Sequence, residues 1–265
     1  MKDGHVHTKY CPHGSLDSFD SYIQKALDLG LSEISFTEHF PLPAEFLNCY
    51  PQFNNGGNMV QKNLMLYFSE ASAIKEKYKD QIKVNIGIEL DYVEGYEKEI
   101  ASMLDEFGKY IDDSLLSVHI IKVRDEYFPI DLDQDIFDKM LHKAGSIQNV
   151  YRIYYETVVK SMSSDLGLYK PKRIGHLNLI RLFSHQFTTN YSEFPVVVEL
   201  LDVMKKDGYT IDYNISGKNR PSGIYIDDLL FRKILEHGID MIYGSDSHNS
   251  DNLETLQEFF NPSIG

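Results

Sequence analysis

The chain alternates short runs of β-forming residues with longer segments in which apolar residues recur at helical spacing. The clearest predicted helix covers Ser18–Leu29, where Phe19, Tyr22 and Ile23 follow that spacing and Gly30 is a natural stop. The other predicted helices cover Lys62–Tyr78, Ile136–Leu166, Phe194–Lys206, Asp227–His237 and Asn252–Phe260. The predicted strands cover His5–Thr8, Glu33–His39, Lys83–Asp91, Leu115–Ile121, Arg173–His176, Thr210–Ile215 and Met241–Gly244.

Strands that alternate with helices favour parallel βα units, and one closed barrel fits a chain of 265 residues better than two domains. An open, doubly wound sheet has the same strand count and stays an alternative. We find no internal repeat, low-complexity tract or long linker, so we expect one domain over residues 1–265. The segment Glu45–Gln61 is expected to be an inserted loop over one end of the barrel.

Composition narrows the class of protein. The chain has 42% hydrophobic and 25% charged residues, which is typical of a soluble globular protein and argues against collagenous, disordered and membrane proteins. Its 26 basic and 40 acidic residues give a formal net charge of −14, so we expect no nucleic-acid partner held by a basic surface. A small phosphorylated substrate stays possible, because surface charges are screened beyond about 8 Å.

Cysteine content and apolar runs bear on the compartment. Cys11 and Cys49 cannot build a disulfide framework, which favours a reducing compartment. No apolar run approaches the roughly 18 residues of a membrane span. The opening residues before His5 leave no room for a signal peptide. We therefore expect a cytoplasmic protein without a membrane partner.

Polar residues suited to metal binding stand at the ends of the predicted strands. They are His5, His39, Glu89, His119, His176 and the pair Asp246 and His248. In a parallel barrel the C-terminal ends of the strands share one face, where active sites are built. Side chains two residues apart on a strand point the same way, so His5 and His7 can present two imidazoles together.

Imidazole nitrogens and carboxylate oxygens suit zinc, iron or manganese in a hydrolytic centre. The carboxylate of Glu89 can place one oxygen on each of two metals, which would lie within about 4 Å of each other. Asp91, two residues further on, is an alternative ligand to Glu89. We leave Cys11 out of the site, because cysteine is often a small buried hydrophobe. His142, His185 and His237 are expected to be structural or surface groups.

These residues also carry a family resemblance. The run Asp3-Gly4-His5-Val6-His7-Thr8, followed by Cys11 and His13, resembles the opening motif of the polymerase-and-histidinol-phosphatase (PHP) superfamily. The family's remaining motifs resemble, in order, Thr37-Glu38-His39, Gly87-Ile88-Glu89, Ser117-Val118-His119, Gly175-His176 and Gly244-Ser245-Asp246-Ser247-His248. The resemblance implies a distorted (β/α)7, TIM-like barrel with three divalent metal ions at the C-terminal ends of the strands.

The resemblance also implies how the ligands are divided. The first metal takes His5, His7, Glu89 and Asp246, the second takes Glu89, His119 and His176, and the third takes His13, His39 and His248. No ligand position is missing, which favours catalysis over a metal-binding regulatory module. An amidohydrolase would share the first His-x-His but would usually need a strand-borne lysine ligand, and no lysine stands at a matching strand end.

Within the superfamily, the chain is most similar to the histidinol-phosphate phosphatases. The similarity lies in the length and in the segments His176–Phe183 and Asn214–Gly223. It implies hydrolysis of L-histidinol phosphate in histidine biosynthesis, with Arg181 and Arg220 as substrate contacts. Either arginine could instead form a surface ion pair. Another PHP phosphoesterase activity, on a nucleotide, a sugar phosphate or phosphotyrosine, stays an alternative.

Two residues are candidates for moving the proton to the leaving group. Asp246 is the first candidate for the proton shuttle, and His248 is the second. Both are also implied metal ligands, so the sequence gives them a double role.

Overall fold

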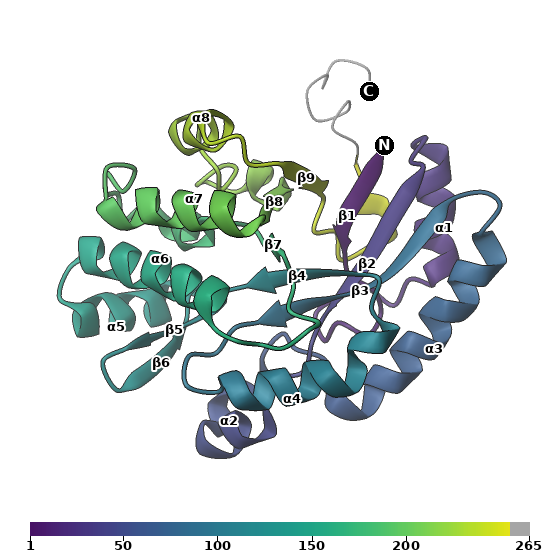
Figure 1. The fold of residues 1–265 in the computed structure, drawn as a ribbon, viewed down its shortest axis with the longest axis horizontal. Coiled ribbons are helices and arrows are strands. Elements are labelled where there is room, and N and C mark those ends of the chain that lie inside the picture. The colour runs from purple at the N-terminus through teal and green to yellow at the C-terminus, as the bar shows by residue number, and fades with distance from the viewer. Residues whose placement is uncertain (255–265) are drawn as a thin grey trace.

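A parallel sheet forms the centre of the molecule, which we describe over residues 1–254 from a computed structural model (Figure 1). Within these residues, seven strands are hydrogen-bonded in the order β1-β2-β3-β4-β7-β8-β9, and every neighbouring pair is parallel. The strands are β1 (Lys2–Val6), β2 (Glu33–His39), β3 (Lys83–Asp91), β4 (Asp113–Ser117), β7 (Arg173–Ile174), β8 (Thr210–Asn214) and β9 (Met241–Gly244).

The sheet closes where the chain leaves β9. Ser247 forms a parallel bridge with Val6 of β1, and the His7 amide donates to the Ser247 carbonyl at 2.9 Å. One step earlier, the Asp246 amide donates to the carbonyl of His5 at 2.8 Å. The closure is irregular, and β7 has only two residues. The predicted distorted seven-stranded barrel is therefore confirmed, and the open sheet is excluded.

Helices surround the strands (Figure 1). They are α1 (Phe19–Asp28), α2 (Ala44–Cys49), α3 (Gln61–Tyr78), α4 (Glu97–Phe107), α5 (Gln134–Ala144), α6 (Ile147–Ser163), α7 (Pro195–Asp207) and α8 (Asp228–Glu236). Short 3-10 turns cover Pro51–Asn55, Gly108–Tyr110, Leu179–Phe183, Ser216–Asn219 and Ser250–Asn252. The core lies between helices and sheet: Phe19 and Tyr22 of α1 pack edge-on against Phe36 of β2. None of the helices in the described part of the chain is long and apolar enough to cross a membrane.

Several predicted elements need correction. The predicted helix Ile136–Leu166 is two helices, because Gly145 adopts a left-handed φ of 84° that ends α5 and the Ser146 side chain caps α6. The helix α4 was not predicted at all. From residue 255 onward, the predicted helix Asn252–Phe260 lies outside the described residues.

The predicted loop Glu45–Gln61 also contains regular structure, since it holds most of α2 and a 3-10 turn. The predicted strand Leu115–Ile121 breaks after Ser117, and the chain continues into an antiparallel hairpin of β5 (Ile120–Val123) and β6 (Glu126–Pro129). The Tyr127 ring of the hairpin packs against the rings of Phe46 and Tyr50, at centroid distances of 5.2 and 4.8 Å. The hairpin and the Glu45–Gln61 segment thus form one continuous wall.

A buried ion pair ties the N-terminal end of the barrel. The Arg173 side chain of β7 is 3% exposed and donates to the Asp113 carboxylate of β4 at 3.0 Å and to the Gly4 carbonyl of β1 at 2.7 Å. Lys2 and Ser35 donate to the same carboxylate. Side chains from four strands, β1, β2, β4 and β7, therefore meet at the Asp113 carboxylate or its Arg173 partner and hold this end of the barrel together.

We expect Arg173→Met to lower the free energy of unfolding by about 3 kcal/mol or more, because it leaves the largely buried Asp113 carboxylate without its guanidinium. Denaturant unfolding measures the change. Lys83→Met is the control: this lysine is 66% exposed in its pair with Glu33, so the expected change is at most about 1 kcal/mol. Equal losses in the two variants would contradict a stabilising role for the buried pair.

Candidate metal centre

The structure brings all nine predicted ligands together at the C-terminal ends of the strands. His39 is the last residue of β2, and Glu89 lies two residues before the end of β3. His119 and His176 follow β4 and β7 by two residues each. The remaining members are His5 and His7 at β1, Asp246 and His248 after β9, and His13 in the loop after β1. Because the strands are parallel, these positions meet at one end of the barrel.

The carboxylate of Glu89 lies in the middle of this group and is 1% exposed. Its Oε2 atom is 3.3 Å from His5 Nε2, 3.4 Å from His7 Nε2 and 3.2 Å from His39 Nδ1. Its Oε1 atom is 2.7 Å from His176 Nε2. Each oxygen therefore faces its own set of imidazoles, which is the arrangement that a carboxylate shared by two metals requires.

Oε1 has two further neighbours. The Ser117 hydroxyl donates to it at 2.7 Å, and His119 Nε2 lies 3.8 Å away. The rings of His119 and His176 are 4.6 Å apart, so both imidazoles approach Oε1 from neighbouring strand ends.

Four atoms test directly whether a metal fits: His5 Nε2, His7 Nε2, Glu89 Oε2 and Asp246 Oδ1. Five of the six distances between them, all except that between the two carboxylates, range from 3.1 to 3.6 Å. A tetrahedral site with ligand bonds of about 2.0–2.2 Å has edges of about 3.3–3.6 Å between ligand atoms. The two imidazoles are thus spaced from each other and from each carboxylate as a divalent cation would hold them.

Carboxylates outside this group fix which nitrogen each histidine presents. Asp212 Oδ2 lies 2.8 Å from His5 Nδ1, and Asp91 Oδ1 lies 2.5 Å from His119 Nδ1. A hydrogen bond at Nδ1 orients the ring and leaves Nε2 free for a metal, as is usual for metal-binding histidines. The position of Asp91 favours this supporting role over the alternative in which it replaces Glu89.

Sequence reasoning missed the role of Asp212. The available signal was an acidic residue inside a predicted apolar strand, Thr210–Ile215, which runs toward the same end of the barrel. Glu38 was quoted only as part of a motif, yet its Oε2 atom lies 3.8 Å from His7 Nδ1 and its side chain is fully buried.

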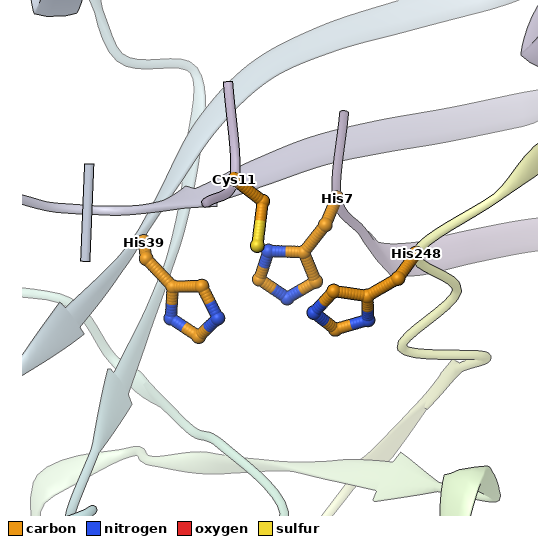
Figure 2. A group of neighbouring side chains, drawn as sticks. All are labelled: His7, Cys11, His39 and His248. Atoms are coloured by element: carbon orange, nitrogen blue, oxygen red, sulfur yellow. The ribbon is translucent and has the colours of Figure 1, made fainter. Parts of the chain in front are cut away.

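A second group of donors lies beside the first (Figure 2). The side chains of His7, Cys11, His39 and His248 point toward one another, and one ligand atom from each lies within 4.8 Å of the others. His13 stacks on His248 with a centroid distance of 4.7 Å. The Nε2 atoms of His39 and His248 are buried without a hydrogen-bond partner among residues 1–254. Unpartnered buried imidazole nitrogens that converge fit a further cation.

Cys11 was expected to lie outside the site. Its thiol instead faces this second group and is buried, and burial raises its pKa to about 11. The thiol is therefore protonated at neutral pH unless a cation approaches it.

The two groups differ in electrostatics. Burial opposes the charged form of His5, but the surrounding carboxylates, led by Asp212, raise its pKa to about 10. Burial lowers the pKa of His248 to about 4, and the neighbouring His7 adds to the effect. The first group thus has a negative field that attracts cations, while burial also lowers the pKa of His39, so that His39 and His248 of the second group present neutral imidazoles.

Placing these ligands strains the backbone. Asp246 adopts a φ of 55° and His176 a φ of 21°, where non-glycine residues are rare. Strain of this kind costs about 1–3 kcal/mol per residue and is common at functional sites. The Asp246 amide bonds the His5 carbonyl, and the His176 amide donates to Asp212 Oδ2 at 3.2 Å, which holds both conformations.

A cavity of about 940 Å³ opens above the centre. Its walls come from the Glu45–Gln61 segment, the β5–β6 hairpin with the start of α5, and the loop after β8. Arg220 lies in the lining of the cavity, and Arg181 does not. Arg181 Nη1 donates to the carbonyls of Ile224 and Tyr225 at 3.0 and 2.9 Å. This position favours support of the loop that follows Arg220 over the expected direct contact with substrate.

The remaining histidines lie away from the cavity lining. His237 is at the end of α8, 2.6 Å from the Lys233 carbonyl, and His185 is exposed beside Gln186. His142 lies on α5.

Comparison with known proteins fits this geometry. A sequence profile of the PHP domain matches residues 3–216. The chain belongs to the PHP domain family. A histidinol-phosphatase from Bacillus subtilis is 37% identical over 263 residues, which cover 98% of this chain and 97% of that protein. The resemblance seen in the sequence is therefore confirmed.

Solved structures share the PHP barrel. A crystal structure from Listeria monocytogenes, provisionally described as a histidinol phosphatase, matches with a TM-score of 0.91 and 31% identity, covering 98% of this chain and all 100% of that chain. Histidinol phosphate phosphatase from Lactococcus lactis, complexed with zinc, L-histidinol and phosphate, matches with a TM-score of 0.67 and 20% identity over 98% and 90% of the two chains. At that identity the second match supports the fold alone.

We expect elemental analysis of protein purified without chelators to find three divalent ions per chain. His5→Ala and Asp246→Asn should each lower the metal content and abolish turnover, because each removes or alters a donor of the first group. His185→Ala is the matched control and should keep both. A metal content below one ion per chain in the unaltered protein would contradict the trinuclear site.

Proposed function

We propose that this PHP protein is a metal-dependent phosphomonoesterase that hydrolyses L-histidinol phosphate to L-histidinol and phosphate in histidine biosynthesis. The observation that carries the proposal is the Glu89 carboxylate, which lies between two sets of imidazoles below a cavity large enough for a small phosphorylated molecule. The full-length similarity to the Bacillus subtilis histidinol-phosphatase supports this substrate. We also propose a single domain and a cytoplasmic location.

The metal ligands would be those that the family resemblance implies. His5, His7, Glu89 and Asp246 would hold one ion, Glu89, His119 and His176 a second, and His13, His39 and His248 a third. Zinc, iron and manganese all suit these donors, and the Lactococcus lactis relative binds zinc. When bound, such ions supply Lewis acidity, which activates water at neutral pH and neutralises phosphate charge.

Arg220 is the residue of this chain best placed to bind phosphate. It is exposed in the cavity lining, and its guanidinium forms no ion pair or hydrogen bond with the described residues. A guanidinium offers two parallel donors that match phosphate oxygens. Arg181 would act through the loop, because its Nη1 atom already donates to the carbonyls of Ile224 and Tyr225.

Asp246 is the proposed proton shuttle for the leaving alcohol. Its Oδ2 atom accepts hydrogen bonds from Ser216 Oγ at 3.1 Å and from Asn214 Nδ2 at 3.2 Å. Ser216 lines the cavity, so a proton on Asp246 can reach the leaving oxygen directly or through this hydroxyl. His248 is the second candidate, with Nδ1 3.7 Å from Asp246 Oδ1.

We expect kcat/KM for L-histidinol phosphate to exceed that for p-nitrophenyl phosphate or a nucleoside monophosphate by at least about 100-fold. Metals bind any monoester, so discrimination must come from polar contacts that the other substrates leave unmade. Phosphate release by metal-reconstituted protein measures the three values. Similar kcat/KM values for the three substrates would indicate a broad phosphoesterase. A preference for the nucleoside monophosphate would indicate a role in nucleotide turnover and contradict a role in histidine biosynthesis.

The two arginines allow a matched test. Arg220→Lys should lower kcat/KM by about tenfold or more, equal to roughly 1.4 kcal/mol of transition-state stabilisation, because lysine cannot offer the paired donors. Arg181→Lys should lower it less. A larger loss of kcat/KM in Arg181→Lys than in Arg220→Lys would indicate that Arg181 is the residue that contacts phosphate.

A further inference from the structure

One carboxylate in the cavity lining has no role in the centre described above. Asp131 is half-buried and forms no hydrogen bond or ion pair through its side chain with any of residues 1–254. Other acidic groups in the lining are engaged: Asp91 bonds His119, and Glu126 pairs with Lys143 at 2.9 Å. Asp131 is therefore an available negative charge in the cavity.

The backbone holds Asp131 close to the centre. The residue follows β6, and the preceding Ile130 is fully buried and donates its amide to the carbonyl of His119 at 2.9 Å. Next to it, Pro129 pairs with Ile120 at the base of the hairpin. Asp131 thus lies two residues beyond the end of β6 and directly follows a residue that is hydrogen-bonded to a proposed metal ligand.

Asp131 shares the cavity with residues on three of its sides. His13, His119 and Tyr225 line the cavity together with it. These residues belong to the loop after β1, the segment after β4 and the loop before α8. The carboxylate therefore faces the volume that they enclose.

The surroundings of Asp131 reduce its solvation. Apolar side chains share the cavity lining with it, among them Phe128, Ile136 and Leu182. The nearest basic residue in sequence that also lines the cavity, Lys139, is not within ion-pair distance of it. A carboxylate beside apolar walls has few solvating partners, so an ion pair with a cationic ligand stabilises it more than it would in open solvent.

We propose that Asp131 is a specificity-determining residue that binds the ammonium group of the substrate's alcohol portion, an inference that rests on the proposed function. With the phosphate at the centre, the amine of L-histidinol phosphate lies one carbon from the ester carbon and extends into the cavity. A primary amine is cationic at neutral pH, whereas an imidazole with a pKa of about 6.5 is mostly neutral. The carboxylate therefore selects the ammonium over the ring.

The test compares Asp131→Asn with the unaltered protein on two substrates: L-histidinol phosphate and the analogue that keeps the imidazole and phosphate but lacks the amine. We expect Asp131→Asn to lower kcat/KM for the first by about 30-fold or more, the range of truncated charge pairs. On the analogue and on p-nitrophenyl phosphate the variant should match the unaltered protein within about twofold. Asp135→Asn, an exposed change on α5 outside the cavity lining, is the matched control.

Inhibition by product gives a second measurement that does not depend on turnover of the analogue. Asp131→Asn should weaken inhibition by L-histidinol and leave inhibition by inorganic phosphate and the metal content unchanged. Equal losses on both substrates, or unchanged inhibition by L-histidinol, would overturn the assignment. If the unaltered protein shows no preference for L-histidinol phosphate over p-nitrophenyl phosphate, the proposed function fails instead. A preference that is undiminished in Asp131→Asn overturns this inference alone.

Discussion

One buried carboxylate, placed between converging imidazoles, is the centre around which the strand ends of this protein are arranged. Glu89 lies on the longest strand of the sheet and reaches His5, His7 and His39 with one oxygen and His176 with the other. Groups of this kind are costly to bury, and they are stabilised when a cation is shared among them. Closure of the barrel through Val6 and Ser247 brings Asp246, which follows the last strand, to within 3.6 Å of the two histidines that face Glu89.

The two ends of the barrel differ in their interactions and in their backbone strain. At the N-terminal end, Arg173 and Asp113 form a buried pair that ties three strands, and no backbone strain accompanies it in the described residues. At the C-terminal end, Asp246 and His176 are held in strained conformations by hydrogen bonds to neighbouring strands. Stability at one end thus supports strained ligand geometry at the other.

The sequence predicted the strands well, and the proposed ligands could be named from it because each belongs to a short motif at the end of a strand. The strands Glu33–His39 and Lys83–Asp91 have the predicted bounds. Contacts between distant residues were less accessible. His5 and Asp212 are 207 residues apart, and no local pattern reveals that one orients the other. The position of Arg181 outside the cavity lining was not predicted for the same reason. Its hydrogen-bond partners belong to a loop some 43 residues away, whose path depends on the whole fold.

The central claim is that Glu89 is shared by two metals and that a third lies beside them. Anomalous diffraction from crystals grown with zinc tests it most directly. The account predicts three peaks per chain, two of them about 2.0–2.2 Å from different oxygens of Glu89 and the third among His13, His39 and His248. A single peak, or peaks that leave Glu89 without a metal on either oxygen, would contradict it.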